Sequence, residues 1–203
     1  MIKFVAPIIL AVLFGCSGKA EQESNTTSST AGTATKEAEG VIIEPQTEAD
    51  TLKGSLKAYT SGKIGDATVT IHYYSPAVRG RMIWGGLVAY NNVWVTGAHR
   101  ATSIEFDKNL KIGDMTLEAG KYAFFTIPGE KEWITIINKD WNQHLTDNYD
   151  EKNDVARLTI TPVIGSTHQE RLRYSINPVT DTSGEIKMHW SKLELVIPFS
   201  VTN

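Results

Sequence analysis

Residues 68–74 read Thr-Val-Thr-Ile-His-Tyr-Tyr, a segment in which apolar and polar side chains alternate. Successive side chains of a strand point to opposite faces of its sheet. Val69, Ile71 and Tyr73 therefore share one face, and the residues between them share the other. This alternation predicts a strand with one face buried against a core and the other face turned to solvent.

Similar short segments follow along the rest of the chain, separated by turn residues. They lie at residues 103–106, 110–112, 115–117, 121–127, 133–138, 155–161, 171–176, 186–190 and 193–199. Gly113 and Asp114, between two of these segments, are a two-residue hairpin signal. No helical stripe of twelve residues or more is visible, and residues 143–154 are the best candidate for a short helix or a long loop. We predict an all-β fold, an antiparallel β-sandwich or partly closed barrel of about nine to ten short strands with at most one short helix.

The composition fits one folded domain with a tail. Of the 203 residues, 41% are hydrophobic and 21% are charged, which is enough apolar material for a packed core. The net charge of −3 gives no electrostatic signature of nucleic-acid binding. The single cysteine excludes a disulfide scaffold and multi-cysteine metal sites. Glycine-rich nucleotide loops, HExxH and nucleophile-elbow motifs are also absent from the sequence, so we expect no cofactor, no metal and no nucleic-acid partner.

The first residues have the pattern of a bacterial lipoprotein signal peptide. Lys3 precedes an apolar run of eleven residues, 4–14, which is too short to span a bilayer as a helix. Residues 13–16 read Leu-Phe-Gly-Cys and resemble a lipobox. The resemblance implies removal of residues 1–15 and acylation of Cys16 with chains such as palmitate, which would hold the protein at a membrane. A stray thiol in an ordinary secreted protein is the alternative interpretation.

Residues 16–50 are expected to form a lipidated, flexible tether. Positions 17–40 contain no Val, Ile, Leu, Met, Phe, Trp or Tyr, and nine of them are Ser or Thr. Such a composition cannot bury enough apolar area to offset its chain entropy. The apolar residues 41–43 could add an edge strand. A single β-rich domain would then span residues 51–203.

The anchor predicts a location in the cell envelope, at the outer membrane, and leaves open whether the domain faces the periplasm or the cell surface. Ser17 follows the cysteine, so nothing at that position argues for retention at an inner membrane. Asp50-Thr51-Leu52 matches a short O-glycosylation sequon of Bacteroidota, and an ordinary linker end is the alternative interpretation of these residues.

Several longer motifs carry a resemblance to a known family. They are YSPAVRGRMIWGGLV at 74–88, NVWVTGAHRAT at 92–102, LEAGKY at 117–122, TIPG at 126–129, Trp133 and INK at 137–139. In order and spacing they resemble the bacterial lipoproteins catalogued as domain of unknown function 2911, which are common in Bacteroidota. The resemblance covers about residues 55–200 and implies an exported, β-rich envelope domain without implying a reaction. The family usually has Arg in place of Val95 and Asn-Glu in place of His99-Arg100.

One segment gathers the side chains that a ligand site needs. The candidate ligand-binding residues are Arg79, Arg81, Trp84, Trp94, Thr96, His99 and Arg100. Glycines between them permit sharp bends, and two arginines could hold a carboxylate or phosphate. Alternatively, the tryptophans belong to the core and the arginines cap carbonyl groups.

Two further sets of residues are weaker candidates. No two of the five histidines show metal-ligand spacing, and convergence of His72, His99 and His144 is left open. An acidic, aromatic loop contains Trp141, His144, Asp147, Tyr149, Asp150, Glu151 and Asp154. Paired carboxylates beside an aromatic ring would suit glycan binding or hydrolysis, whereas solvated loop charges are the simpler interpretation.

Two classes of function follow from these observations. The first is a non-enzymatic envelope module that binds a glycan, a peptide or a partner protein, and the expected anchor and tether favour it. The alternative is a small hydrolase or isomerase with its site around residues 74–102. The sequence identifies no catalytic residues, so whether the chain is an enzyme stays open.

Overall fold

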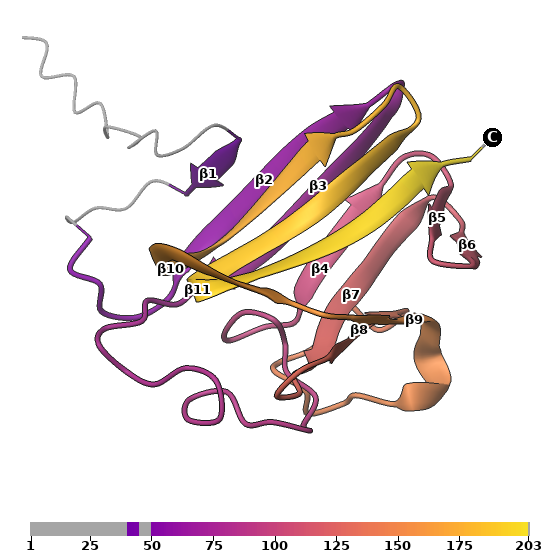
Figure 1. The fold of residues 1–203 in the computed structure, drawn as a ribbon. Helices are drawn as coiled ribbons and strands as arrows, with labels where there is room; N and C mark the ends of the chain where they lie inside the picture. Colours follow the sequence, from indigo (N-terminus) through magenta and orange to yellow (C-terminus); the bar gives the residue numbers. More distant parts are fainter. Residues whose placement is uncertain (1–39, 45–49, 203) are drawn as a thin grey trace, which may run out of the picture. The chain divides into compact units, whose positions relative to one another are not determined.

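The computed structural model describes residues 40–44 and 50–202, which contain eleven strands and one 3₁₀ turn (Figure 1). All of them belong to the unit Gly32–Asn203. The expected signal peptide, Cys16 and most of the expected tether lie outside the described residues. In the part of the chain that is described, no helix is long and apolar enough to cross a membrane.

Seven strands form one antiparallel sheet. In spatial order they are β1 (Val41–Ile43), β2 (Leu56–Ile64), β3 (Ala67–Ser75), β4 (Thr102–Phe106), β7 (Gly120–Ile127), β8 (Trp133–Asn138) and β9 (Asp154–Ile160). The three apolar residues of β1 do add an edge strand, with Ile42 opposite Tyr59 of β2. The C-terminal end of the expected tether is therefore part of the folded unit.

The second sheet has four strands, in the order β10 (Val163–Pro178), β11 (Ser183–Val201), β5 (Leu110–Ile112) and β6 (Met115–Leu117). It faces the larger sheet in Figure 1. The two antiparallel sheets are not closed into a barrel, so the sandwich prediction is confirmed and the partly closed barrel is not the fold adopted.

The strand count differs from the predicted nine to ten for two reasons. The predicted number leaves out β2 and the possible edge strand β1, and the segments 186–190 and 193–199 both fall within the nineteen-residue β11. Strand β11 folds back at Ser191, which has a φ of 57°, and Val201 N donates to Thr182 O at 2.8 Å. The predicted turn is thus a single left-handed residue inside one long element.

The main core lies between the sheets and matches the sequence prediction. Val69, Ile71 and Tyr73 of β3 are all buried there, together with Leu172 and Tyr174 of β10. A second, smaller core lies between strands β7 and β8 and the connection from β3 to β4. It contains Ala123 and Phe125 of β7, Ile136 of β8, and Val95 and Ala101 of the connection. Because the connection between β3 and β4 covers part of the outer face of β7 and β8, these strands are buried on both faces.

The segment 143–154 is a loop with one short turn. Its only helical element is the 3₁₀ turn η1 (Glu151–Asn153), and the Asp150 side chain accepts a hydrogen bond from Lys152 N at 3.0 Å. Three residues are too few for an α-helix, so the long-loop alternative is the better description.

Candidate functional site

The connection between β3 and β4, residues 76–101, starts as an extension of the sandwich. Leu172 N donates to Pro76 O at 3.0 Å, and Val78 N donates to Glu170 O at 2.9 Å. Strand β10 therefore holds the start of the connection. At Arg79, which has a φ of 52°, the backbone of the connection turns away from β10.

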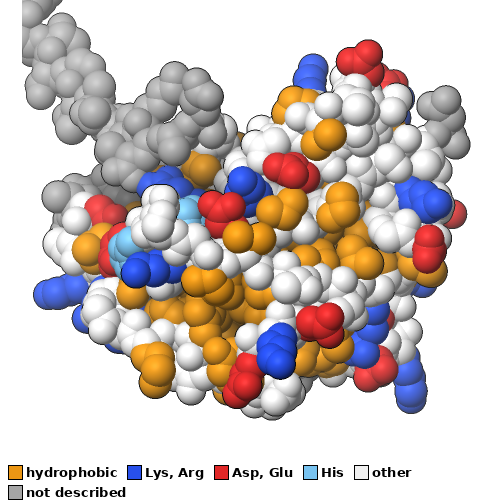
Figure 2. Space-filling view, in the orientation of Figure 1, with side chains coloured by type: hydrophobic (Ala, Val, Ile, Leu, Met, Phe, Trp, Pro, Cys, Tyr) orange, Lys and Arg blue, Asp and Glu red, His pale blue; other side chains and the backbone are white. Residues whose placement is uncertain are grey.

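A hollow of about 300 Å³ opens between this connection, the segment before β2 and the bend of β11. We call it the Arg79 hollow. Trp94 and Trp190 line it with stacked rings whose centroids are 5.9 Å apart, and Leu87 and Pro76 add apolar surface. Arg79, Arg81 and His99 also line it. In the space-filling view of Figure 2, hydrophobic side chains gather in a hollow in the lower half of the face, with charged side chains around it.

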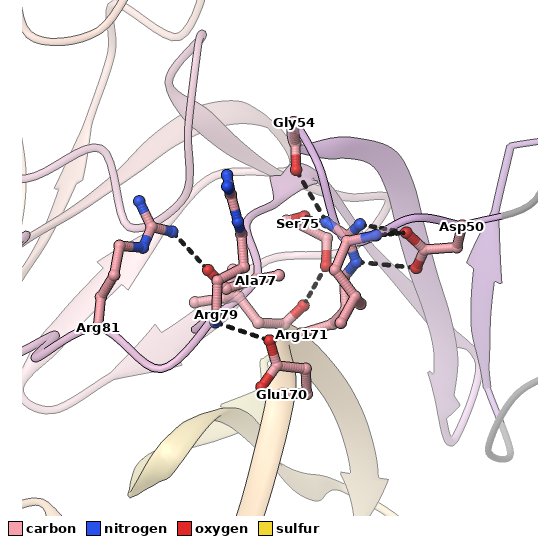
Figure 3. Close-up of polar contacts among 10 residues, drawn as sticks. Asp50, Gly54, Ser75, Ala77, Arg79, Arg81, Glu170 and Arg171 are labelled. Atoms are coloured by element: carbon pink, nitrogen blue, oxygen red, sulfur yellow. Dashed lines mark hydrogen bonds and ion pairs between the residues drawn. The ribbon is translucent and has the colours of Figure 1, made fainter.

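The two arginines of the hollow have different surroundings. Arg81 Nε donates to Val78 O at 3.1 Å and Arg81 Nη2 to Ala77 O at 2.6 Å, so this guanidinium caps the connection (Figure 3). Arg79 donates only its backbone N–H, to Glu170 Oε1 at 2.8 Å. Within residues 40–44 and 50–202, no group hydrogen-bonds to or forms an ion pair with the Arg79 guanidinium. Arg79 therefore presents an uncompensated cation at the hollow.

His99 stands exposed at the same hollow. Its ring meets Tyr74 edge to face, with centroids 5.1 Å apart and planes at 82°. Its backbone oxygen accepts a hydrogen bond from Leu145 N at 3.1 Å. Neither ring nitrogen has a hydrogen-bond partner among the described residues, so both are available to a ligand.

Strained backbone concentrates around the hollow. Arg79, Thr96, His99 and Leu145 have φ values of 52°, 52°, 61° and 46°, all in the left-handed region that residues other than glycine rarely adopt. Such conformations cost about 1–3 kcal/mol each and persist where surrounding contacts enforce them. Three of these four residues line the hollow itself.

Thr96 is one of the contacts that enforce this geometry. It is completely buried, and its carbonyl accepts hydrogen bonds from Tyr174 Oη at 2.6 Å and Thr102 Oγ1 at 3.0 Å. Its hydroxyl lies 3.1 Å from that of Thr126. Thr96 therefore holds the connection against the underlying strands and does not line the Arg79 hollow.

Trp84 belongs to a cluster of four tryptophans. Its ring lies 4.8 Å from that of Trp133 and 5.7 Å from those of Trp94 and Trp190, all edge to face. Its indole N–H is buried and has no acceptor among the described residues. Trp84 thus belongs to the tryptophan cluster and is not among the residues that line the hollow.

Arg100 lies apart from the other candidates. Its guanidinium Nη2 donates to Asn142 Oδ1, and it lines a different hollow, on the outer face of the larger sheet. Adjacent residues His99 and Arg100 therefore serve two different surfaces.

The weaker candidates do not assemble into a site. No three His, Cys, Asp or Glu side chains within residues 40–44 and 50–202 form a metal-binding group, so His72, His99 and His144 do not converge on a metal position. In the acidic loop, Asp154 accepts hydrogen bonds from Tyr149 Oη at 2.8 Å and from Arg157 Nε at 2.7 Å. These contacts make Asp154 a part of the loop framework.

Other lining residues gave no signal in the sequence. Gly54 and Ser55 come from the segment before β2, Leu145 from the 143–154 loop and Trp190 from β11. Gly54 and Ser55 reach the hollow because Arg171 of β10 donates hydrogen bonds both to Gly54 O, at 3.0 Å, and to Ser75 O, at 2.7 Å. The sequence of a predicted strand that contains an arginine does not indicate which distant carbonyl groups this arginine will contact.

The fold and site define a class, an antiparallel β-sandwich whose long β3–β4 connection builds a hollow over a tryptophan cluster. A family model described as "Protein of unknown function (DUF2911)" matches residues 55–199, and the chain belongs to this family. The predicted family membership is thus confirmed. No curated protein and no solved structure matches the chain.

Proposed function

We propose that this chain is a lipid-anchored binding protein of the bacterial cell envelope, and that the Arg79 hollow takes a peptide ending in an apolar residue with a free carboxylate. One observation carries the proposal. The uncompensated Arg79 guanidinium, the Arg81 guanidinium and the His99 ring line the same hollow as two tryptophan rings.

The charge of the hollow supports an anionic ligand. None of its described lining residues is Asp or Glu, whereas two are Arg. A carboxylate placed between Arg79 and Arg81 would form charge-assisted hydrogen bonds, which are stronger than those between neutral groups. The capping contacts of Arg81 hold its guanidinium in place before any ligand arrives.

The size and floor of the hollow support an apolar residue next to that carboxylate. A volume of about 300 Å³ is at the small end of ligand sites, which suits one or two amino-acid residues. The partly exposed ring of Trp94, backed by the stacked and buried ring of Trp190, offers apolar area that favours a Leu or aromatic side chain.

A hydrolase or isomerase at this position is less well supported. His99 could serve as a general base, but a catalytic imidazole is usually oriented by a carboxylate, and no described lining residue carries one. Ligand binding needs only the groups that are present. Release of amino acids from the test peptides would favour the enzyme.

The location of the protein is proposed on sequence grounds. The lipobox-like residues 13–16 and the single Cys16 support lipidation, and the family resemblance supports a lipoprotein of Bacteroidota type at the outer membrane. Replacement of Cys16 by Ser should move the full-length protein from the membrane fraction to the soluble fraction. Unchanged membrane association would contradict lipidation.

The binding proposal is tested by tryptophan fluorescence. Short peptides ending in Leu or Phe are titrated as free acids and as C-terminal amides. The free acids should change the emission of the tryptophan cluster, because they contact Trp94, whose ring stacks on the buried Trp190. Equal responses to acid and amide would contradict the assigned role of the arginines.

A further inference from the structure

The outer face of the larger sheet carries a second hollow, of about 230 Å³, which we call the Arg100 hollow. Its lining residues include Lys57, His72, Arg100, Ser103, Lys121 and Trp141. They come from four neighbouring strands and from the loops that flank β4 and follow β8. Nothing in the proposed peptide site involves this surface.

The alternation of the strands produces this hollow. His72 of β3 lies directly opposite Ser103 of β4, and Lys57 of β2 lies opposite Tyr74. Their inward-facing neighbours are core residues, so these side chains point away from the core. The loop after β8 closes one side, where Asn142 Oδ1 accepts a hydrogen bond from Arg100 Nη2.

Three cations line the Arg100 hollow without a carboxylate among its described lining residues. Lys57 Nζ contacts Glu44 at 2.7 Å and Lys121 Nζ contacts Glu105 at 3.5 Å, and neither acid lines the hollow. Among the described residues, the Arg100 guanidinium hydrogen-bonds only to the neutral Asn142. The uncompensated charge of the hollow is therefore positive and centred on Arg100.

Aromatic and neutral polar groups lie beside these charges. Trp141 is 40% exposed, and Lys121 Nζ lies 4.4 Å from the centroid of its ring. Burial lowers the pKa of His72, so at neutral pH its imidazole is uncharged and can both donate and accept hydrogen bonds. Ser103 and Asn142 add a hydroxyl and an amide. Such a mixture suits a ligand with many hydroxyl groups and one negative charge.

We propose that the Arg100 hollow binds a sugar unit that carries a carboxylate, as in an acidic polysaccharide. The negative group would meet Arg100 and Lys57, the ring would lie against Trp141, and the hydroxyl groups would bond to His72, Ser103 and Asn142. A neighbouring hollow of about 480 Å³ shares His72 and Lys121 and is also lined by Glu105 and Asp107, so it gives room for a second sugar unit that is neutral. This site is separate from the Arg79 hollow, and Tyr74 and His99 stand between the two.

The experiment is calorimetric titration of the folded domain with a uronic-acid oligosaccharide and with the neutral oligosaccharide of the same linkage. The acidic compound should bind, and the neutral one should bind at least about tenfold more weakly. Arg100→Gln and Lys57→Gln should each weaken binding of the acidic compound about tenfold or more. Lys63→Gln, which removes an exposed β2 charge that does not line the hollow, should leave binding unchanged.

Three results with the oligosaccharides would overturn the proposal. They are equal binding of the neutral compound, unchanged affinity in Arg100→Gln, and an equal loss in Lys63→Gln, which would indicate nonspecific attraction. Full displacement by inorganic phosphate at equal concentration would show that the hollow takes an anion alone, and would also overturn the sugar assignment. Arg79→Gln should not alter this titration, so the proposal stands or fails separately from the peptide site.

Discussion

Asp50 and Arg171 form a two-point ion pair between residues 121 positions apart in the chain, with Arg171 Nε 3.0 Å from Asp50 Oδ2 and Nη2 against Oδ1. Arg171 is 3% exposed and also donates through Nη1 to Gly54 O and Ser75 O. The pair therefore fastens the segment before β2 to β10. This contact places Gly54 and Ser55 in the wall of the Arg79 hollow.

Loss of Arg171 should destabilise the domain. Arg171→Ala leaves two carbonyl groups and Asp50 without their donor, and we expect a loss of about 3 kcal/mol in the free energy of unfolding. Asp50→Asn should cost about 1 kcal/mol, because the Asp50 side chain is 38% exposed and solvent screens the pair. Urea unfolding measures both, and Arg79→Ala is the control with little change. A loss below about 1 kcal/mol for Arg171→Ala would contradict the fastening role.

The same pair predicts a pH dependence. The hydrogen bonds from Arg171 hold the pKa of Asp50 below its ordinary value of 3.8. Because the folded pKa is the lower one, the stabilisation is complete above the unfolded pKa and is lost as the pH falls through the folded pKa. Between about pH 5 and about pH 3, the wild type should lose more stability than Asp50→Asn. Parallel curves for the two proteins would contradict this assignment.

Close packing between the sheets predicts a glycine requirement at residue 62. A Cβ added to Gly62 would lie 2.8 Å from Ile176 Cβ and Cγ2, on the facing strand β10. Gly62→Ala should therefore cost about 1–3 kcal/mol through overpacking. The matched control is Gly165→Ala, since an added Cβ there has no atom closer than 4.0 Å. Equal melting temperatures for the two variants would show that the sheets adjust.

Truncation should separate the tether from the fold. Deletion of residues 17–39 should leave the melting temperature nearly unchanged, because the sequence of this segment offers almost no apolar area to bury. Deletion of residues 17–50 should lower it by several degrees, because it also removes β1 and Asp50. Calorimetric scans of both forms measure the difference, and equal midpoints would show that β1 adds no stability.

The sequence predicts those parts of the fold that local patterns determine. The alternation at 68–74 and the Gly113-Asp114 hairpin correspond to β3 and to the β5–β6 turn. The sequence does not predict strand β2, because Ser61, Gly62 and Lys63 interrupt its apolar pattern. Glycine at 62 is required by contact with a strand more than 100 residues away, which no local pattern reveals.

The candidate site is predictable from the sequence only where its residues are close together in the chain. Arg79, Arg81, Trp94 and His99 are close in sequence, and the connection between β3 and β4 brings them to one hollow. Thr96 is buried beneath the connection and Trp84 packs, partly buried, in the tryptophan cluster. Arg100 faces another surface, next to the left-handed His99. Such left-handed conformations depend on tertiary hydrogen bonds like those to Thr96 O.

The central claim is that the Arg79 guanidinium recognises a ligand carboxylate and does not hold the fold together. The measurement is the ratio of the dissociation constants of one Leu- or Phe-ending peptide as C-terminal amide and as free acid, in the wild type and in Arg79→Gln. The ratio should be about tenfold or more in the wild type and should fall several-fold in Arg79→Gln, where only the Arg81 guanidinium remains, with the melting temperature unchanged. Arg100→Gln, which alters the other hollow, should keep the wild-type ratio. An undiminished ratio in Arg79→Gln would contradict the account.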